Sequence, residues 1–130
     1  VAEAIDDYFQ QLRPMRSPHL VQGQLSPAAE RGKKLFFSET VGCADCHKGA
    51  LYTDLKFHDV GTIGKFDQPV DRFDTPSLIE VWRSGPYLHD GRATTLRDIF
   101  TTFQRDDKHG VTSHLTPKQI DDLAEYVLSL

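Results

Sequence analysis

The sequence lacks several features that would assign it to a specialised class of protein. It has no run of about 18 apolar residues, so no segment could span a membrane as a helix. It has no excess of positive charge: 15 basic and 19 acidic residues give a net charge of −4, which argues against a nucleic-acid-binding surface. With 9 glycines, 7 prolines and 2 cysteines, it is neither collagen-like nor a disulfide-rich scaffold. Its 130 residues, 38% of them hydrophobic, are therefore expected to form one globular domain with its own core.

Hydrophobic spacing and capping residues predict a mostly α-helical chain. The expected helices cover residues 1–12, 26–37 and 75–82, and two more begin at Thr95 and Thr116. The last four of these begin with a serine or threonine N-cap, and in three of them a proline follows at the first helical position. No segment shows the alternation that is typical of a strand. Residues 48–74 form a long irregular segment, which is suited to wrapping around a cofactor.

Residues 1–25 are predicted to lie outside the main domain, which covers residues 26–130. A helical apolar face that begins at Val1 ends before Pro14, and the residues that follow have the prolines and the glycine of a linker. The apolar and aromatic spacing of this first helix resembles that at the C-terminal end of the chain. We therefore expect the tail helix of a preceding domain plus a linker. The alternative is an extra helix that packs on this domain.

One glycine inside a predicted helix indicates a close contact between two helices. Gly32 lies in the helix over residues 26–37, where glycine costs about 1 kcal/mol relative to alanine. Because glycine has no side chain, a second helix can approach it closely. We expect the first and last helices of the main domain to cross at Gly32. The alternative is a glycine that is merely tolerated.

The only two cysteines lie in the sequence Cys43-Ala44-Asp45-Cys46-His47. This C-x-x-C-H spacing is the pattern of covalent c-type haem attachment. Two thiols three residues apart can reach the two vinyl groups of one porphyrin, and the adjacent imidazole then reaches the iron. The motif predicts one covalent haem c, with thioethers at Cys43 and Cys46 and with His47 as the proximal iron ligand.

Three other interpretations of the two cysteines have less support in the sequence. A thioredoxin-like redox motif expects a βαβ context, which the pattern of the chain does not provide. A structural zinc site uses four ligands, usually with further cysteines, and the sequence has no third cysteine. A plain disulfide would leave His47 and the compact spacing as a coincidence.

Covalent haem attachment also predicts where the protein acts. Attachment of this type takes place outside the cytoplasm, so we expect a periplasmic or other extracytoplasmic location. No secretory signal precedes Val1, so we expect a processed product or a piece of a longer chain.

Three further segments identify a family. They are Arg72-Phe73-Asp74-Thr75-Pro76-Ser77-Leu78, Gly85-Pro86-Tyr87-Leu88-His89-Asp90-Gly91-Arg92 and Thr95-Leu96. Together with Arg31-Gly32-Lys33-Lys34-Leu35-Phe36 before the haem motif, they resemble the C-terminal, electron-transferring haem domain of the bacterial di-haem cytochrome c peroxidase and MauG family. The resemblance covers residues 26–130 and implies a c-type cytochrome fold, with helices and long irregular loops around one haem. Each full enzyme of the family has two haem domains, so a single C-x-x-C-H motif implies the electron-transfer half of a longer protein.

The resemblance also implies roles for the turn that contains His89. In the family this histidine lies near the haem and the domain interface without binding the iron, so His89 is a predicted cofactor-binding residue. The alternative is a turn residue that is hydrogen-bonded to the backbone. Backbone oxygens of the same turn help to bind a calcium ion in the family. Here they would be the carbonyls of Ser84 and Pro86, for which the sequence supplies no partner ligands.

The sequence departs from the family at the sixth iron ligand. The position of the family's axial methionine or tyrosine falls on Phe103, whose ring has no donor atom. His109 is the favoured candidate, because it precedes a glycine in the loop before the last helix, where cytochromes usually present the distal ligand. His58, His114, Met15 from the linker, and an iron without a protein ligand on this face are the alternatives.

Three functions are compatible with these motifs. The leading one is an electron-transfer c-type cytochrome domain, whose partner is a redox protein or a neighbouring haem domain. The second is a peroxidase or MauG-like oxidase with an open iron site, which needs a distal acid–base group that the sequence does not identify. The third is a haem-based sensor, for which no output element is evident. A low-spin, six-coordinate iron would favour electron transfer over the other two.

Overall fold

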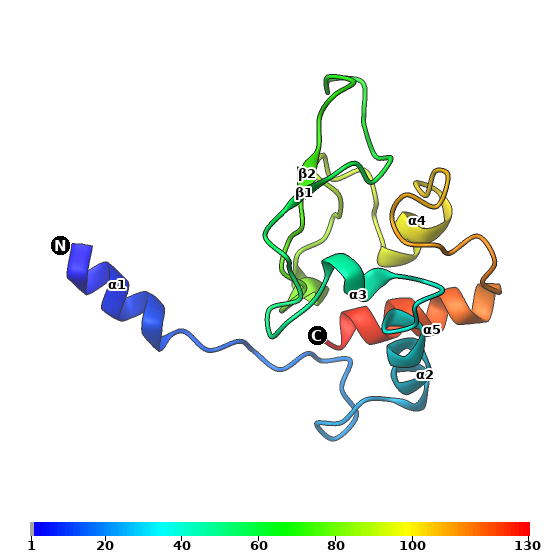
Figure 1. Cartoon of the computed structure of the whole chain (residues 1–130). Coiled ribbons are helices and arrows are strands. Elements are labelled where there is room, and N and C mark those ends of the chain that lie inside the picture. Colours follow the sequence, from blue (N-terminus) through cyan, green and yellow to red (C-terminus); the bar gives the residue numbers. More distant parts are fainter. Residues whose placement is uncertain (1) are drawn as a thin grey trace.

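A computed structural model describes residues 2–130, so Val1 of the predicted first helix lies outside the described residues. In chain order the elements are α1 (Ala2–Gln11), α2 (Pro27–Phe36), α3 (Cys43–Cys46), β1 (Phe57–His58), β2 (Phe73–Asp74), the 3-10 helix η1 (Val81–Arg83), α4 (Leu96–Thr101) and α5 (Pro117–Leu128) (Figure 1). Turns and loops make up the rest, so the predicted mostly α fold is confirmed. No helix within this described part is long and apolar enough to cross a membrane.

The core of the domain is built where α2 crosses α5. An ideal Cβ atom on Gly32 would lie 1.9 Å from the carbonyl oxygen of Asp122 and 2.8 Å from the Cβ of Tyr126. Beside this point, the guanidinium of Arg31 donates two hydrogen bonds of 2.7 and 2.6 Å to the carboxylate of Asp122. The predicted crossing at Gly32 is therefore confirmed, and no larger residue fits there without moving a backbone.

Local sequence signals correctly predict where the main helices begin. The hydroxyl of Ser26 caps α2 by accepting a hydrogen bond from the amide of Ala29, and Pro27 follows as the first helical residue. Thr116 and Gln119 form a reciprocal capping box at the start of α5. The face of α5 that is buried in the core includes the four residues predicted for it, Ile120, Leu123, Ala124 and Val127. Capping and periodicity thus determine α2 and α5, which together with α3 we call the helical base.

The prediction of a helix over residues 75–82 is wrong. Only Val81–Arg83 forms a short 3-10 helix, whereas residues 75–78 have no regular structure and residues 79–80 form a turn. The physical reason is that β2 pairs antiparallel with β1, and the amide of Thr75 donates a 2.9 Å hydrogen bond to the carbonyl of Lys56 beyond the strand. A Thr-Pro start signal is overridden by pairing with a segment far away in the sequence.

The N-terminal segment is anchored only in its second half. Helix α1 stands apart from the domain in Figure 1, and none of its described residues is buried. From Met15 onward the chain is held: the Met15 amide donates to the carboxylate of Glu80, and the Ser17 hydroxyl donates a 2.6 Å hydrogen bond to the carbonyl of Leu128. The predicted linker is therefore attached to η1 and to the end of α5.

Candidate haem-binding site

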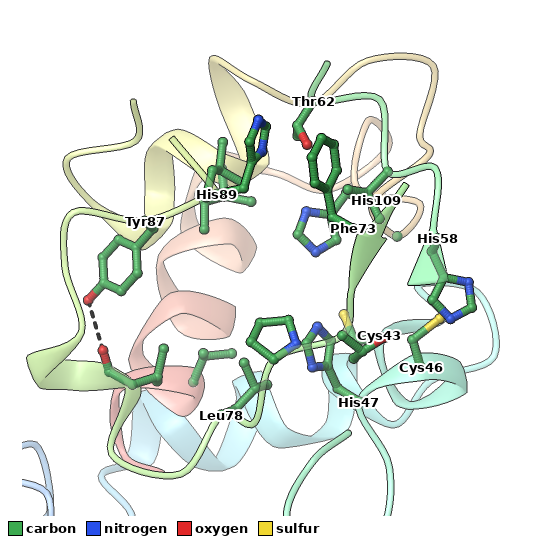
Figure 2. A pocket seen from close by; sticks show the side chains of 18 of the residues that line it. Cys43, Cys46, His47, His58, Thr62, Phe73, Leu78, Tyr87, His89 and His109 are labelled. Carbon is green, nitrogen blue, oxygen red and sulfur yellow. Dashed lines mark hydrogen bonds between the residues drawn. The ribbon is translucent and has the colours of Figure 1, made fainter. Parts of the chain in front are cut away.

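A cavity of about 660 Å³ lies between the helical base and the loops that cover it. We call these loops, residues 48–75 and 102–115, the loop cap. The apolar part of the cavity wall includes Phe36, Leu78, Val81, Leu96, Ile99, Phe100 and Val127. This volume lies within the range of about 300–1,000 Å³ that cofactor sites occupy. Cys43, Cys46 and His47 line the same cavity, together with His58, His89 and His109 (Figure 2).

The helical base presents the three residues of the haem motif. The single turn of α3 carries both cysteines, and the His47 amide closes this turn with a 3.0 Å hydrogen bond to the carbonyl of Cys43. The Nδ1 atom of His47 lies 3.0 Å from the carbonyl oxygen of Tyr52, which can only accept, so Nδ1 carries the proton. The lone pair of Nε2 is then free to bind a metal ion. Burial lowers the pKa of His47, which favours the neutral ring that a metal requires.

The loop cap presents His109 on the other side of the cavity. Figure 2 shows its ring facing that of His47, and the ring centroids are 6.3 Å apart with the planes inclined by 32°. Bonds from a metal to imidazole nitrogen are about 2.0–2.1 Å long, so a metal ion held in line between two rings keeps their centroids roughly 6 Å apart. The two imidazoles are therefore spaced to bind one metal ion between them.

The surroundings of His109 also favour a neutral ring. Burial, and then the nearby His47, lower the pKa of His109 to about 4. Its Nδ1 atom is buried and has no hydrogen-bond partner within residues 2–130. The His109 ring is thus ready to bind a metal ion, but no polar contact among these residues fixes its orientation.

The other predicted ligand candidates are placed differently. His58 lines the cavity, but its Nε2 lies 2.9 Å from a carboxylate oxygen of Asp54. Met15 and His114 are not among the residues that line the cavity. Phe103, at the position of the family's axial residue, does not line it either and instead packs against the hydrophobic core just beyond the end of α4.

His89 contributes to the wall of the cavity. Its ring stacks on that of Phe73, with centroids 3.8 Å apart and planes inclined by 13°. Its Nε2 lies 2.8 Å from a carboxylate oxygen of Asp67, which also accepts a 2.6 Å hydrogen bond from the amide of Gly64. The turn that contains His89 is thereby tied to the loop cap.

The environment of the cysteines does not suit thiolate chemistry. Burial raises the pKa of the Cys43 thiol to about 12, and burial also raises the pKa of Cys46. A redox-active or metal-binding cysteine needs the thiolate form. The ligand atoms of Cys46, Asp54 and His58 do lie within 4.8 Å of one another. However, a structural zinc site uses four ligands, and this group supplies three.

Two residues that shape the site carry no signal in the sequence. Tyr52 contributes a carbonyl group to His47, and the side chain of Gln104 holds the backbone of His109. Both contacts depend on the path of an irregular loop. A backbone carbonyl is common to every residue type, so no motif could have identified Tyr52.

The fold and this site together define a c-type cytochrome domain, with helices and irregular loops around a haem-sized cavity that contains a C-x-x-C-H motif. The chain belongs to the cytochrome c family, whose model, "Cytochrome c", matches residues 29–130. Membership of this family implies covalently bound haem c.

Relatives of known identity narrow the family further. The chain is 35% identical to hydrazine synthase subunit gamma of Kuenenia stuttgartiensis, over 98% of this chain and 48% of that protein. It is 39% identical to the methylamine utilization protein MauG of Methylorubrum extorquens, over 55% of this chain and 23% of that protein. It is 26% identical to the cytochrome-c peroxidase IdrP1 of a Pseudomonas species, over 68% of this chain and 34% of that protein.

A solved structure shows the same fold. A chain of Kuenenia stuttgartiensis hydrazine synthase superimposes with a TM-score of 0.85 and 34% identity, over 98% of this chain and 54% of that chain. The chain therefore spans about half the length, or less, of the relatives it matches. The predicted c-type cytochrome fold and the resemblance to the di-haem peroxidase and MauG family are confirmed. So is the prediction of a c-type cytochrome domain with peroxidase-like relatives, all of them longer than this chain.

Proposed function

We propose that this chain is a mono-haem electron-transfer domain whose iron has two histidine ligands. Cys43 and Cys46 would hold the porphyrin through thioethers, His47 would bind the iron from the helical base, and His109 would bind it from the loop cap. The haem supplies one-electron chemistry, in which the iron alternates between the ferric and ferrous states. The protein's residues hold the two ligands in place and exclude water with the apolar wall.

The observation that carries this proposal is the pair of facing imidazoles across the cavity, with centroids 6.3 Å apart. Both rings are held in the neutral form, because burial lowers the pKa of each. Two histidine ligands leave no open position at the iron. Peroxide or gas chemistry needs such a position, so this geometry favours electron transfer over a peroxidase or MauG-like oxidase.

The N-terminal segment supports a role within a larger assembly. The described residues of α1 bury none of their side chains, and Ile5, Tyr8, Phe9 and Leu12 are exposed by 49–62%. We propose that residues 1–25 are the tail helix of a preceding domain plus an anchored linker. A neighbouring haem domain or a redox protein would then exchange electrons with residues 26–130. MauG and the gamma subunit of hydrazine synthase, which are both longer than this chain, support this proposal by analogy.

The cellular location and a possible calcium ion concern the protein beyond its haem site. We propose a periplasmic or other extracytoplasmic location, because haem attachment of this type takes place outside the cytoplasm. A calcium ion at the carbonyls of Ser84 and Pro86, which line the cavity, stays a prediction of the resemblance alone.

The decisive experiment is a ferric and ferrous visible spectrum of the purified holoprotein, with its intact mass. We expect one haem per chain, retained in acidified organic solvent, and a low-spin spectrum that added peroxide leaves unchanged. The variant His109→Ala should become high-spin and should bind cyanide. A wild type that is already high-spin would place the peroxidase function ahead of electron transfer.

A further inference from the structure

The two facing histidines are held by different means. The ring of His47 has a hydrogen-bond partner in the carbonyl of Tyr52, whereas the buried Nδ1 of His109 has none within residues 2–130. His109 also lies on a loop rather than on a helix. Its ring can therefore be directed at the iron only through its backbone and the packing around it.

One side chain binds the backbone of His109 at both of its polar groups. The Oε1 atom of Gln104 accepts a 3.2 Å hydrogen bond from the His109 amide. The Nε2 atom of Gln104 lies 3.0 Å from the His109 carbonyl oxygen and 2.6 Å from that of Gly110, to which it can donate. A neutral amide offers both an acceptor and two donors, which a carboxylate, an ammonium or a hydrocarbon of similar length does not.

Other contacts also stabilise the path of this loop. Asp106 and Asp107 have φ angles of 51° and 52°, a conformation that is costly for residues other than glycine. The Asp107 carboxylate offsets this cost by accepting 3.0 Å hydrogen bonds from the amides of Thr112 and Ser113.

Gly110 lets the loop approach the helical base. Its φ is 78°, and a Cβ atom there would lie 3.2 Å from the carbonyl oxygen of Val41. That same carbonyl accepts a 2.8 Å hydrogen bond from the amide of Val111. The loop is thus fixed on both sides of His109, and within residues 2–130 Gln104 is the one side chain that hydrogen-bonds to His109 itself.

We propose that Gln104 is the positioning residue for the distal ligand, and that it sets how readily His109 leaves the iron. This inference rests on the proposed function, because it requires His109 to be a ligand. By holding the peptide groups on both sides of the His109 Cα atom, Gln104 limits the directions in which the imidazole can point. Without it, the loop has more conformations, and the iron position opens more often to other ligands.

The test compares two substitutions at Gln104 with the same substitutions at a second glutamine. Gln104→Leu removes both the acceptor and the donors, and Gln104→Glu keeps the acceptor but turns a carboxylate toward two carbonyl oxygens. Gln119→Leu and Gln119→Glu are the controls, because Gln119 also bonds to backbone, at the start of α5, and does not line the cavity.

The measurements are made on the holoprotein. The rates of cyanide binding to the ferric form and of carbon monoxide binding to the ferrous form report how often His109 dissociates. Thermal unfolding followed by far-ultraviolet circular dichroism reports overall stability. We expect both Gln104 variants to bind these probes at least about tenfold faster than the wild type, a factor that corresponds to about 1.4 kcal/mol. The Gln119 variants should bind them at the wild-type rate, even where they unfold at a lower temperature.

The variant His109→Ala separates the two ways in which the inference could fail. If His109→Ala stays low-spin, another residue binds the iron, and the proposed function fails together with this inference. If His109→Ala becomes high-spin but the Gln104 variants bind cyanide no faster than the Gln119 variants, only the positioning role is overturned. If only Gln104→Leu is faster, the acceptor alone positions His109, and the proposed role of the donors is wrong.

Discussion

The helical base and the loop cap hold one histidine each, and they do so in different ways. His47 directly follows Cys46 at the end of α3, and a carbonyl group fixes its ring. His109 lies in a loop, where a side chain five residues earlier holds its backbone and no polar group within residues 2–130 contacts its Nδ1. The proximal side is thus set by local sequence and the distal side by loop packing. The distal side is therefore the one that can be tuned.

The largest loss of stability is expected from a substitution in the helical base. Replacing Gly32 with alanine places a methyl group against the backbone of α5, at a distance that real Cβ atoms do not adopt. We expect a loss of about 3 kcal/mol of stability, because neither backbone can move without disturbing the core. Chemical denaturation of the holoprotein, followed by circular dichroism, measures this loss. A Gly32→Ala protein as stable as the wild type would contradict the tight crossing of α2 and α5.

The loop cap is expected to unfold before the helical base. Loops with few buried contacts open at a lower free energy than packed helices. Addition of guanidinium chloride to the ferric holoprotein should therefore convert the low-spin spectrum to a high-spin or denaturant-ligated one before the helical signal falls. Coincident transitions by visible absorption and circular dichroism would show that the loop cap and the helical base unfold together.

A smaller effect is expected at the ion pair beside the helix crossing. The hydrogen bond from Arg31, and then that from Lys118, lower the pKa of Asp122 against the opposing effect of burial. A carboxylate whose pKa is lower in the folded than in the unfolded state stabilises the protein at pH values above the unfolded pKa of about 3.9. This stabilisation is lost as the pH falls through the folded-state pKa. Asp122→Asn should therefore be less stable than the wild type at pH 7, and the difference should shrink below about pH 4. A difference in unfolding midpoint that does not change with pH would show that charge is not the cause.

The smallest effects on the spectra and on stability are expected from substitutions outside the cavity. Neither Met15 nor His114 lines it, so Met15→Ala and His114→Ala should leave the ferric and ferrous spectra unchanged. Met15 is exposed and contacts η1, so its replacement should change stability only slightly. A spectral change in either variant would mean that the distal ligand comes from elsewhere than His109.

The helical base and the chemistry of its haem motif follow from local features of the sequence. Capping residues such as Ser26 and Thr116, the apolar face of α5 and the spacing of Cys43, Cys46 and His47 act over a few residues, so they can be recognised locally. Gly32 could also be interpreted, because a glycine inside a helix has few uses other than close packing.

The path of the loop cap depends instead on contacts between residues far apart in the chain. The pairing of β1 with β2 replaced a helix that the Thr75-Pro76 signal predicts, because hydrogen bonds to a distant segment outweighed a local cap. The sequence named His109 as one of several distal candidates, but only the folded loop brings its ring to 6.3 Å from that of His47. Gln104 carries no signal of its own, since its role depends on where an irregular loop returns. Such a path is fixed by contacts between residues far apart in the chain, and no local pattern encodes it.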